Sequence, residues 1–207
     1  MPLIVPTITA QTLEDYSKQL ENISFAERIH VDVSDGIFSP TQTVPLANAY
    51  WHEDQAADIH MMVENPLLHV ETLISMNPSL IILHAESAEV FSTITELQKF
   101  NIPVGLALLA KTELHMIEEA LPQLNHVLIF GGKLGFQGGQ ADLSQLKKVE
   151  QIRRMHPEIE IGWDGGANAQ TISEILAAGV DVVNVGSAIQ KADNSKDAYD
   201  TLMREIS

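Results

Sequence analysis

The chain has no cysteine, few basic residues and no long apolar run. The absence of cysteine from the 207 residues excludes disulfide bonds, thiolate zinc sites and thiol nucleophiles. Only 12 Lys and Arg residues stand against 28 Asp and Glu residues, which gives a formal net charge of -16. Because a negative net charge of this size repels nucleic-acid phosphates and anionic lipids, we expect no nucleic-acid partner and no membrane partner.

Hydropathy and composition favour a globular protein. No apolar run approaches the roughly 18 residues of a membrane-spanning helix. The opening MPLIVPTITAQ has no basic segment and enters a strand-like run directly, so no signal peptide is expected. Apolar residues make up 45% of the chain, enough for a full core. We therefore expect a cytoplasmic protein in which residues 1–207 form one domain.

Eight short apolar or β-branched runs recur along the chain and predict strands. They occupy residues 3–8, 28–33, 57–62, 80–85, 103–108, 126–130, 159–164 and 181–186. Helical patterns lie between most of them, whereas 38–51 has two prolines and no clear period, which predicts at most a short helix. Strands that alternate with helices pair in parallel through right-handed crossovers. Eight such units predict the α/β class and a closed (β/α)8 TIM barrel, with an open doubly wound sheet as the alternative.

Polar side chains lie on several predicted strands near the end where such barrels keep their chemistry. Because side chains alternate along a strand, His30 and Asp32 share the inward face of the second strand. The same alternation brings His60 inward from the third strand and Asp164 inward from the seventh. Uncompensated carboxylates inside a barrel are costly, and a divalent cation would neutralise both. The donor set suits Zn²⁺, Fe²⁺, Mn²⁺ or Co²⁺.

The fourth predicted strand ends with two further polar residues, His84 and Glu86, on one face. Two interpretations are open for this pair. The side chains either support a metal ligand from behind or are structural polar groups.

Glycine-rich segments follow the last three strands, at residues 131–139, 165–166 and 186. A single Gly-Gly pair is usually a turn. Three such segments at one end of a barrel indicate a phosphate site made of backbone N–H groups and helix N-termini. This would explain how an acidic chain with few lysines binds an anionic ligand.

These motifs together resemble the ribulose-phosphate 3-epimerase family over essentially the whole chain. In chain order, the matching segments are Pro6-Thr7-Ile8, His30-Val31-Asp32 with Asp35-Gly36, His60-Met61-Met62-Val63, His84-Ala85-Glu86, Gly135-Phe136 with Gly138-Gly139-Gln140, Asp164-Gly165-Gly166 and Gly186-Ser187-Ala188.

The resemblance implies a metal-dependent ketose-phosphate 3-epimerase that interconverts ribulose 5-phosphate and xylulose 5-phosphate through an enediolate. It implies that His30, Asp32, His60 and Asp164 bind one divalent metal ion per chain, and that Asp32 and Asp164 are also the catalytic acid and base. The implied partner is a small phosphorylated ketose, and the implied assembly is a homo-oligomer. The implied substrate-binding residues are Thr7, His60, Met62, Gly135, Gly138, Gly139, Gly165, Gly166, Gly186 and Ser187.

The chain departs from the family pattern around the sugar rather than around the metal. Ser34 and Phe130 stand where methionines are expected, Thr7 replaces a serine, and Gln137 lengthens the glycine loop. These departures leave open a 3-epimerase of another phosphorylated ketose, such as a hexulose 6-phosphate. A non-catalytic barrel that binds a sugar phosphate is a further alternative. Related barrel lyases use a lysine after the second-strand aspartate, which Asp32-Val33-Ser34-Asp35 lacks.

Overall fold

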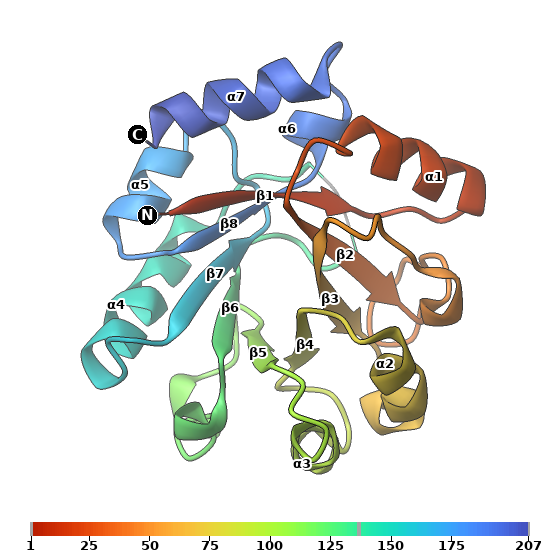
Figure 1. Cartoon of the computed structure of the whole chain (residues 1–207). Helices are drawn as coiled ribbons and strands as arrows, with labels where there is room; N and C mark the ends of the chain where they lie inside the picture. Colours follow the sequence, from red (N-terminus) through yellow and green to blue (C-terminus); the bar gives the residue numbers. More distant parts are fainter. Residues whose placement is uncertain (1, 136–137, 207) are drawn as a thin grey trace.

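The computed structural model describes residues 2–135 and 138–206 and shows eight parallel strands closed into a barrel in chain order (Figure 1). The barrel is closed by hydrogen bonds between the first and last strands, because β1 pairs with β8 from Leu3 to Pro6. The predicted TIM barrel is therefore confirmed, and each strand ends within one residue of its expected bounds. The strands are β1 Leu3–Ile8, β2 Arg28–Ser34, β3 Ala56–Met62, β4 Leu80–His84, β5 Val104–Leu108, β6 His126–Phe130, β7 Glu160–Asp164 and β8 Val182–Val185.

Helices surround the barrel, but not every crossover contains an α-helix. The connections β2–β3 and β5–β6 contain only 3-10 helices within the described residues, and the short helix expected in 38–51 is one of them. No helix in the described part of the chain combines the length and apolarity needed to cross a membrane. The helices are α1 Leu13–Asn22, η1 Leu46–Asn48, η2 Pro66–His69, α2 Val70–Met76, α3 Val90–Gln98, η3 Leu114–Met116, η4 Leu121–Gln123, η5 Leu143–Gln145, α4 Leu146–Met155, α5 Ile172–Ala177, α6 Ser187–Gln190 and α7 Ser195–Glu205.

The main apolar core lies between the outer face of the barrel and the helices. Val31 and Val33 of β2 and Trp163 of β7 belong to it, as strand alternation predicts. Inside the barrel, a separate apolar cluster fills the middle. Its members are Leu80, Ile82, Ala107 and Leu128. Polar side chains occupy inward positions toward both ends of the barrel, and at the carboxyl end they are joined by Met62 and Phe130.

The amino ends of the strands carry an ion-pair network. Arg28 donates from Nε to Asp58 at 2.8 Å and from two guanidinium nitrogens to the carboxylate of Glu160, also at 2.8 Å. His126 Nδ1 lies 2.7 Å from Glu160 Oε2. Four strands are thus joined at the end of the barrel opposite the candidate site.

Candidate active site

The four predicted metal ligands meet at the carboxyl end of the barrel. One donor atom from each of His30, Asp32, His60 and Asp164 lies within 4.8 Å of the other three. His60 Nδ1 is 3.0 Å from Asp32 Oδ1 and 3.7 Å from Asp164 Oδ2. Both imidazoles are fully buried, whereas the two carboxylates keep slight access to the cavity. The arrangement fits a divalent cation, because two carboxylates and two imidazoles face one point.

His30 supplies an independent argument for a cation at this position. Its Nε2 lies 3.3 Å from Asp32 Oδ1, but neither ring nitrogen has a hydrogen-bond partner among the described residues. Buried polar atoms are normally hydrogen-bonded. A buried imidazole nitrogen that makes no hydrogen bond within the described residues, and that lies close to the carboxylates of Asp32 and Asp164, has the properties of a metal ligand.

The two carboxylates have different electrostatic surroundings. Burial by itself would raise the pKa of Asp32, but contacts with His30 and His60 outweigh burial and hold that pKa well below its usual range. Burial raises the pKa of Asp164, and the negative charge of Asp32 raises it further. An opposite charge favours the ionised form of a carboxyl group, so a cation would relieve the repulsion within this pair.

His60 is held from behind by a chain of polar contacts. Its Nε2 lies 2.9 Å from His84 Nε2, and His84 Nδ1 lies 3.2 Å from Glu86 Oε2. Glu86 also accepts hydrogen bonds from the Leu109 backbone N–H and the Thr112 hydroxyl. If His60 Nδ1 is the ligand atom, Nε2 carries the proton and donates to His84, whose own Nδ1–H then donates to Glu86. Of the two interpretations left open for His84 and Glu86, these contacts favour support of a metal ligand.

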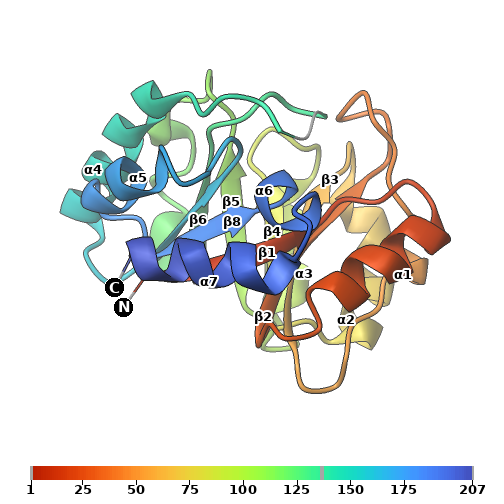
Figure 2. The same ribbon diagram turned by 90° about the horizontal axis from the view of Figure 1, so that it is seen from above.

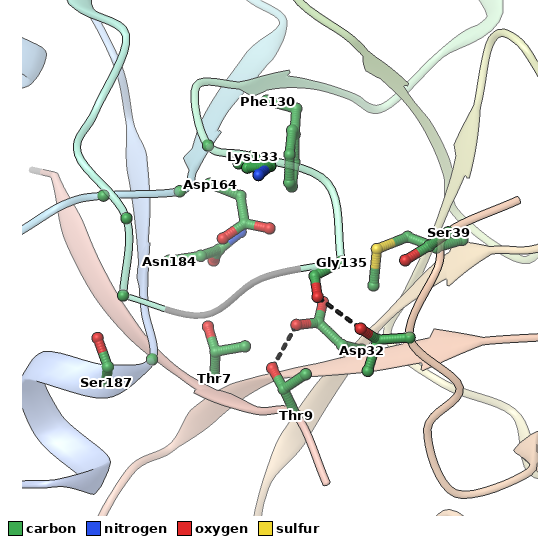
Figure 3. Close-up of a pocket in the computed structure, with 18 of the residues that line it drawn as sticks. Thr7, Thr9, Asp32, Ser39, Phe130, Lys133, Gly135, Asp164, Asn184 and Ser187 are labelled. Atoms are coloured by element: carbon green, nitrogen blue, oxygen red, sulfur yellow. Dashed lines mark hydrogen bonds between the residues drawn. The ribbon is translucent and has the colours of Figure 1, made fainter. Parts of the chain in front are cut away.

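A hydroxyl that sequence reasoning missed fixes one carboxylate. Thr9, just beyond β1, donates from Oγ1 to Asp32 Oδ2 at 2.5 Å (Figure 3). The two residues are 23 positions apart, and a lone threonine after a strand carries no signal of such a contact. Because Thr9 occupies Oδ2, Asp32 Oδ1 is the oxygen turned toward the histidines.

A cavity of about 450 Å³ opens in front of the four residues. Asp32 and Asp164 face it from either side, and Phe130 forms part of its wall (Figure 3). Of the predicted substrate-binding residues, His60 is buried behind the wall and the others line it. The lining ones are Thr7, Met62, Gly135, Gly138, Gly139, Gly165, Gly166, Gly186 and Ser187. Ser34 and Phe130, which depart from the family pattern, also line the cavity, whereas Phe136 and Gln137 lie outside the described residues.

The glycine loop after β7 has a backbone that other residues would strain. Gly165 and Gly166 have φ values of +105° and +70°. A Cβ on Gly165 would overlap the Gly132 backbone, and one on Gly166 would overlap the Ala141 backbone. Trp163 Nε1 donates to the Gly165 carbonyl oxygen at 2.9 Å, which anchors the loop to the outer core. The loops after β6 and β7 therefore pack main chain against main chain, as a site built from backbone N–H groups requires.

Asp35, which the sequence placed in a family motif, has a structural role in this arrangement. Its carboxylate accepts hydrogen bonds from the backbone N–H groups of Ile37, Phe38 and Glu64. These contacts hold the pKa of Asp35 below its usual value even though burial opposes them. The loop after β2 is thus fastened to the segment after β3, and the mouth of the cavity is fixed on that side.

The closed barrel and the His/Asp cluster together define a (β/α)8-barrel enzyme with a candidate metal centre at the carboxyl ends of its strands. Comparison with known proteins narrows this class. Residues 3–190 match the Ribulose-phosphate 3 epimerase family. The chain therefore belongs to the ribulose-phosphate 3-epimerase family and is an isomerase that acts on carbohydrates.

Curated relatives match over nearly their whole length. The ribulose-phosphate 3-epimerase of Helicobacter pylori (strain J99) is 34% identical over 208 residues, which cover 96% of this chain and 95% of that protein. The Schizosaccharomyces pombe enzyme of the same name is 27% identical over 98% of this chain and 93% of its own.

Among solved structures, more distant proteins share the fold. The 3-hexulose-6-phosphate synthase from Salmonella typhimurium has a TM-score of 0.75 at 13% identity, with 98% of this chain and 97% of that chain covered. KGPDC from Streptococcus mutans has a TM-score of 0.75 at 10% identity, with 100% of this chain and 97% of that chain covered. At these identities the likeness concerns the barrel alone.

Proposed function

We propose that the chain, as one barrel domain, is a metal-dependent ketose-phosphate 3-epimerase that interconverts ribulose 5-phosphate and xylulose 5-phosphate. One observation carries the proposal. Asp32 and Asp164 come from β2 and β7, which β1 and β8 separate, and both carboxylates face the same cavity (Figure 3). Inversion at C3 needs a base on one side of the sugar chain and an acid on the other, and this pair supplies both.

Each carboxylate has a defined task in this reaction. One removes the proton from C3 and the other returns a proton to the opposite face, with the roles exchanged in the reverse direction. Thr9 holds Asp32 in a fixed orientation for this transfer. A divalent ion held by His30, Asp32, His60 and Asp164 would supply Lewis-acid stabilisation of the negative charge that develops when C3 loses its proton.

The glycine loops hold the far end of the substrate in this proposal. Gly138, Gly165, Gly166 and Gly186 line the cavity, and Ser187 lies beside them at the start of α6. Backbone N–H groups here can bind a phosphate without lysine or arginine side chains. Binding the phosphate far from C3 also orients the carbon that reacts. A cytoplasmic location and a homo-oligomeric assembly complete the proposal and remain predictions.

Proton exchange tests the proposal directly. The metal-loaded protein is incubated in D₂O with ribulose 5-phosphate, a hexulose 6-phosphate and free ribulose, and NMR follows deuterium at C3. We expect deuterium uptake and the C3 epimer from ribulose 5-phosphate, and much slower uptake with free ribulose. Faster turnover of the hexulose 6-phosphate would favour that substrate, which the unusual Ser34 and Phe130 side chains would contact. No exchange with any compound would instead indicate a non-catalytic sugar-phosphate-binding barrel.

A further inference from the structure

The cavity wall contains a buried side-chain amide that makes no hydrogen bond to any residue the structure describes. Asn184 is only 2% exposed, and neither its Oδ1 nor its Nδ2 has a hydrogen-bond partner among the described residues. Thr7 Oγ1 and Ser39 Oγ, which line the same cavity, are likewise buried and without partners. A buried amide that makes no hydrogen bonds destabilises the fold. Such a group at a cavity wall is therefore a candidate for contact with a ligand.

The position of Asn184 on β8 defines which part of a ligand it can reach. Val183 and Val185 belong to the outer core, so alternation turns Asn184 inward. It pairs in register with Asp164, and it precedes Gly186 by two residues. Figure 3 shows the amide beside the Asp164 carboxylate, with Thr7 and Ser187 on its other side. Asn184 thus lies between the proton-transfer group and the phosphate loops.

The hydrogen-bonding capacity of an amide indicates which chemical group of a ligand Asn184 can bind. Its oxygen accepts hydrogen bonds and its nitrogen donates two. A phosphate dianion offers only acceptors and would leave Oδ1 unsatisfied. A hydroxyl group both donates and accepts, so hydroxyls can satisfy either side of the amide.

We propose that Asn184 is a specificity-determining residue that hydrogen-bonds a hydroxyl of the ketose phosphate on the chain between the inverted carbon and the phosphate. In ribulose 5-phosphate this is the C4 hydroxyl. The inference rests on the proposed function, because that function places C3 at Asp164 and the phosphate at Gly186. Thr7 borders the same position from β1 and completes a polar wall around that hydroxyl.

Substrate discrimination tests the inference. The wild type and Asn184→Leu, which has a similar volume, are compared on ribulose 5-phosphate and its 4-deoxy analogue by C3 proton exchange in D₂O. We expect the wild type to prefer the hydroxylated compound by about 10- to 100-fold in kcat/KM. In Asn184→Leu the preference should fall to within about threefold of unity. A variant that retains the wild-type preference overturns the inference.

Thermal stability supplies a second readout that needs no catalysis. Because the buried amide has no hydrogen-bond partner in residues 2–135 and 138–206, Asn184→Leu should raise Tm, by about 2 °C or more. Asn168 is the matched control, since it lines the same cavity but donates to the Gly166 carbonyl oxygen and accepts from the Gln170 N–H. Asn168→Leu should lower Tm. A clear loss of stability in both variants would mean that Asn184 is a structural residue.

Failure of the inference and failure of the proposed function can be told apart. If the wild type exchanges no C3 proton in any ketose phosphate, the proposed function fails. Thermal-shift titration with the same two compounds then decides the inference through the preference in binding. Should Asn184→Leu not fold, Asn184→Val takes its place in both measurements, because valine already occupies the neighbouring positions of β8.

Discussion

Glu86 is connected to the candidate metal centre through two imidazole rings, those of His84 and His60. Its carboxylate orients His84, and His84 orients His60, so its negative charge favours the tautomer in which His60 Nδ1 is free to bind a cation. Burial lowers the pKa of His84 to about 4, against the opposing effect of Glu86. His84 is therefore neutral at pH 7, as a ring that accepts from one neighbour and donates to the other must be.

Glu86→Gln should weaken metal binding. The amide keeps the volume of the side chain but loses the charge that holds the His84 proton on Nδ1. We expect the Kd for Zn²⁺ or Mn²⁺ to rise about 10- to 100-fold in a chelator-competition titration. Glu64→Gln, which changes an exposed carboxylate after β3, serves as the control and should bind metal like the wild type. Equal affinities in the two variants would show that Glu86 is only structural.

Replacement of either central carboxylate should separate proton removal from inversion. Asp32→Asn and Asp164→Asn should each abolish formation of the C3 epimer, and one of them should still exchange the C3 proton from a single face. NMR in D₂O measures both processes, and metal content is determined on the same samples so that lost metal is not mistaken for lost acid–base chemistry. Near wild-type epimerisation by either variant would disprove the two-carboxylate mechanism.

Strand parity explains why some of these residues could be predicted from sequence and others could not. His30 and Asp32 are two positions apart on one strand, and their inward direction follows from alternation alone. Thr9 and Asn184 depend on contacts across the barrel, which no local pattern reports. Asn184 is a single polar residue in the apolar run Val182–Val185. That its amide makes no hydrogen bond with the described residues can be seen only once the neighbouring strands are in place.

The connecting loops also have features that the sequence predicts and features that depend on the folded structure. Glycine content predicted three loops around one cavity, and the structure brings all three together. Their mutual packing, with Gly166 against the Ala141 backbone, depends on the path of the chain after β6. Likewise, no pattern in 109–125 indicated that the β5–β6 crossover would hold two 3-10 helices instead of an α-helix.

Alanine substitutions at Gly166, in the loop after β7, and at Gly179 should separate the effect of backbone strain from the effect on substrate binding. Gly166 and Gly179 both have positive φ, at +70° and +102°, so alanine at either position is strained. Only at Gly166 would the new Cβ overlap main chain, because Gly179 has nothing closer than the Arg153 side chain at 3.7 Å.

We therefore expect Gly166→Ala and Gly179→Ala both to lower Tm by about 2 °C or more. Only Gly166→Ala should also weaken binding of ribulose 5-phosphate, by about tenfold or more in an isothermal titration. A Gly179→Ala variant with equally weakened binding would mean that general destabilisation, and not the loop, determines affinity.

For the molecule as a whole, the strands run between the two ends of the barrel (Figure 2). The apolar cluster of Leu80, Ile82, Ala107 and Leu128 lies between these ends. At the amino end, burial opposes ionisation of Glu160, but Arg28 and His126 outweigh it and hold its pKa well below the usual value of 4.5. The folded state thus binds fewer protons at this site than the unfolded state. The stabilisation is present above about pH 4.5 and is lost as the pH falls toward the folded pKa.

Glu160→Gln should accordingly lower Tm most at neutral pH. We expect the difference in Tm between wild type and variant to be large at pH 7 and to shrink progressively below pH 4.5. Scans are run in EDTA so that release of metal does not contribute. The control is Glu158→Gln, which changes an exposed carboxylate on the preceding turn. Its Tm should equal that of the wild type at every pH. A wild-type-to-Glu160→Gln difference that does not change with pH would contradict the ion-pair network.

The apolar cluster between the two polar ends also affects how the protein can change over generations. Ser34, Phe130 and Asn184 face the cavity, whereas Arg28 and Glu160 join strands at the other end. Substitutions that change the cavity to fit a new sugar can therefore accumulate without breaking the ion pairs that join strands at the amino end. Related proteins with this barrel can therefore differ in substrate while the ion-pair network at the amino end stays the same.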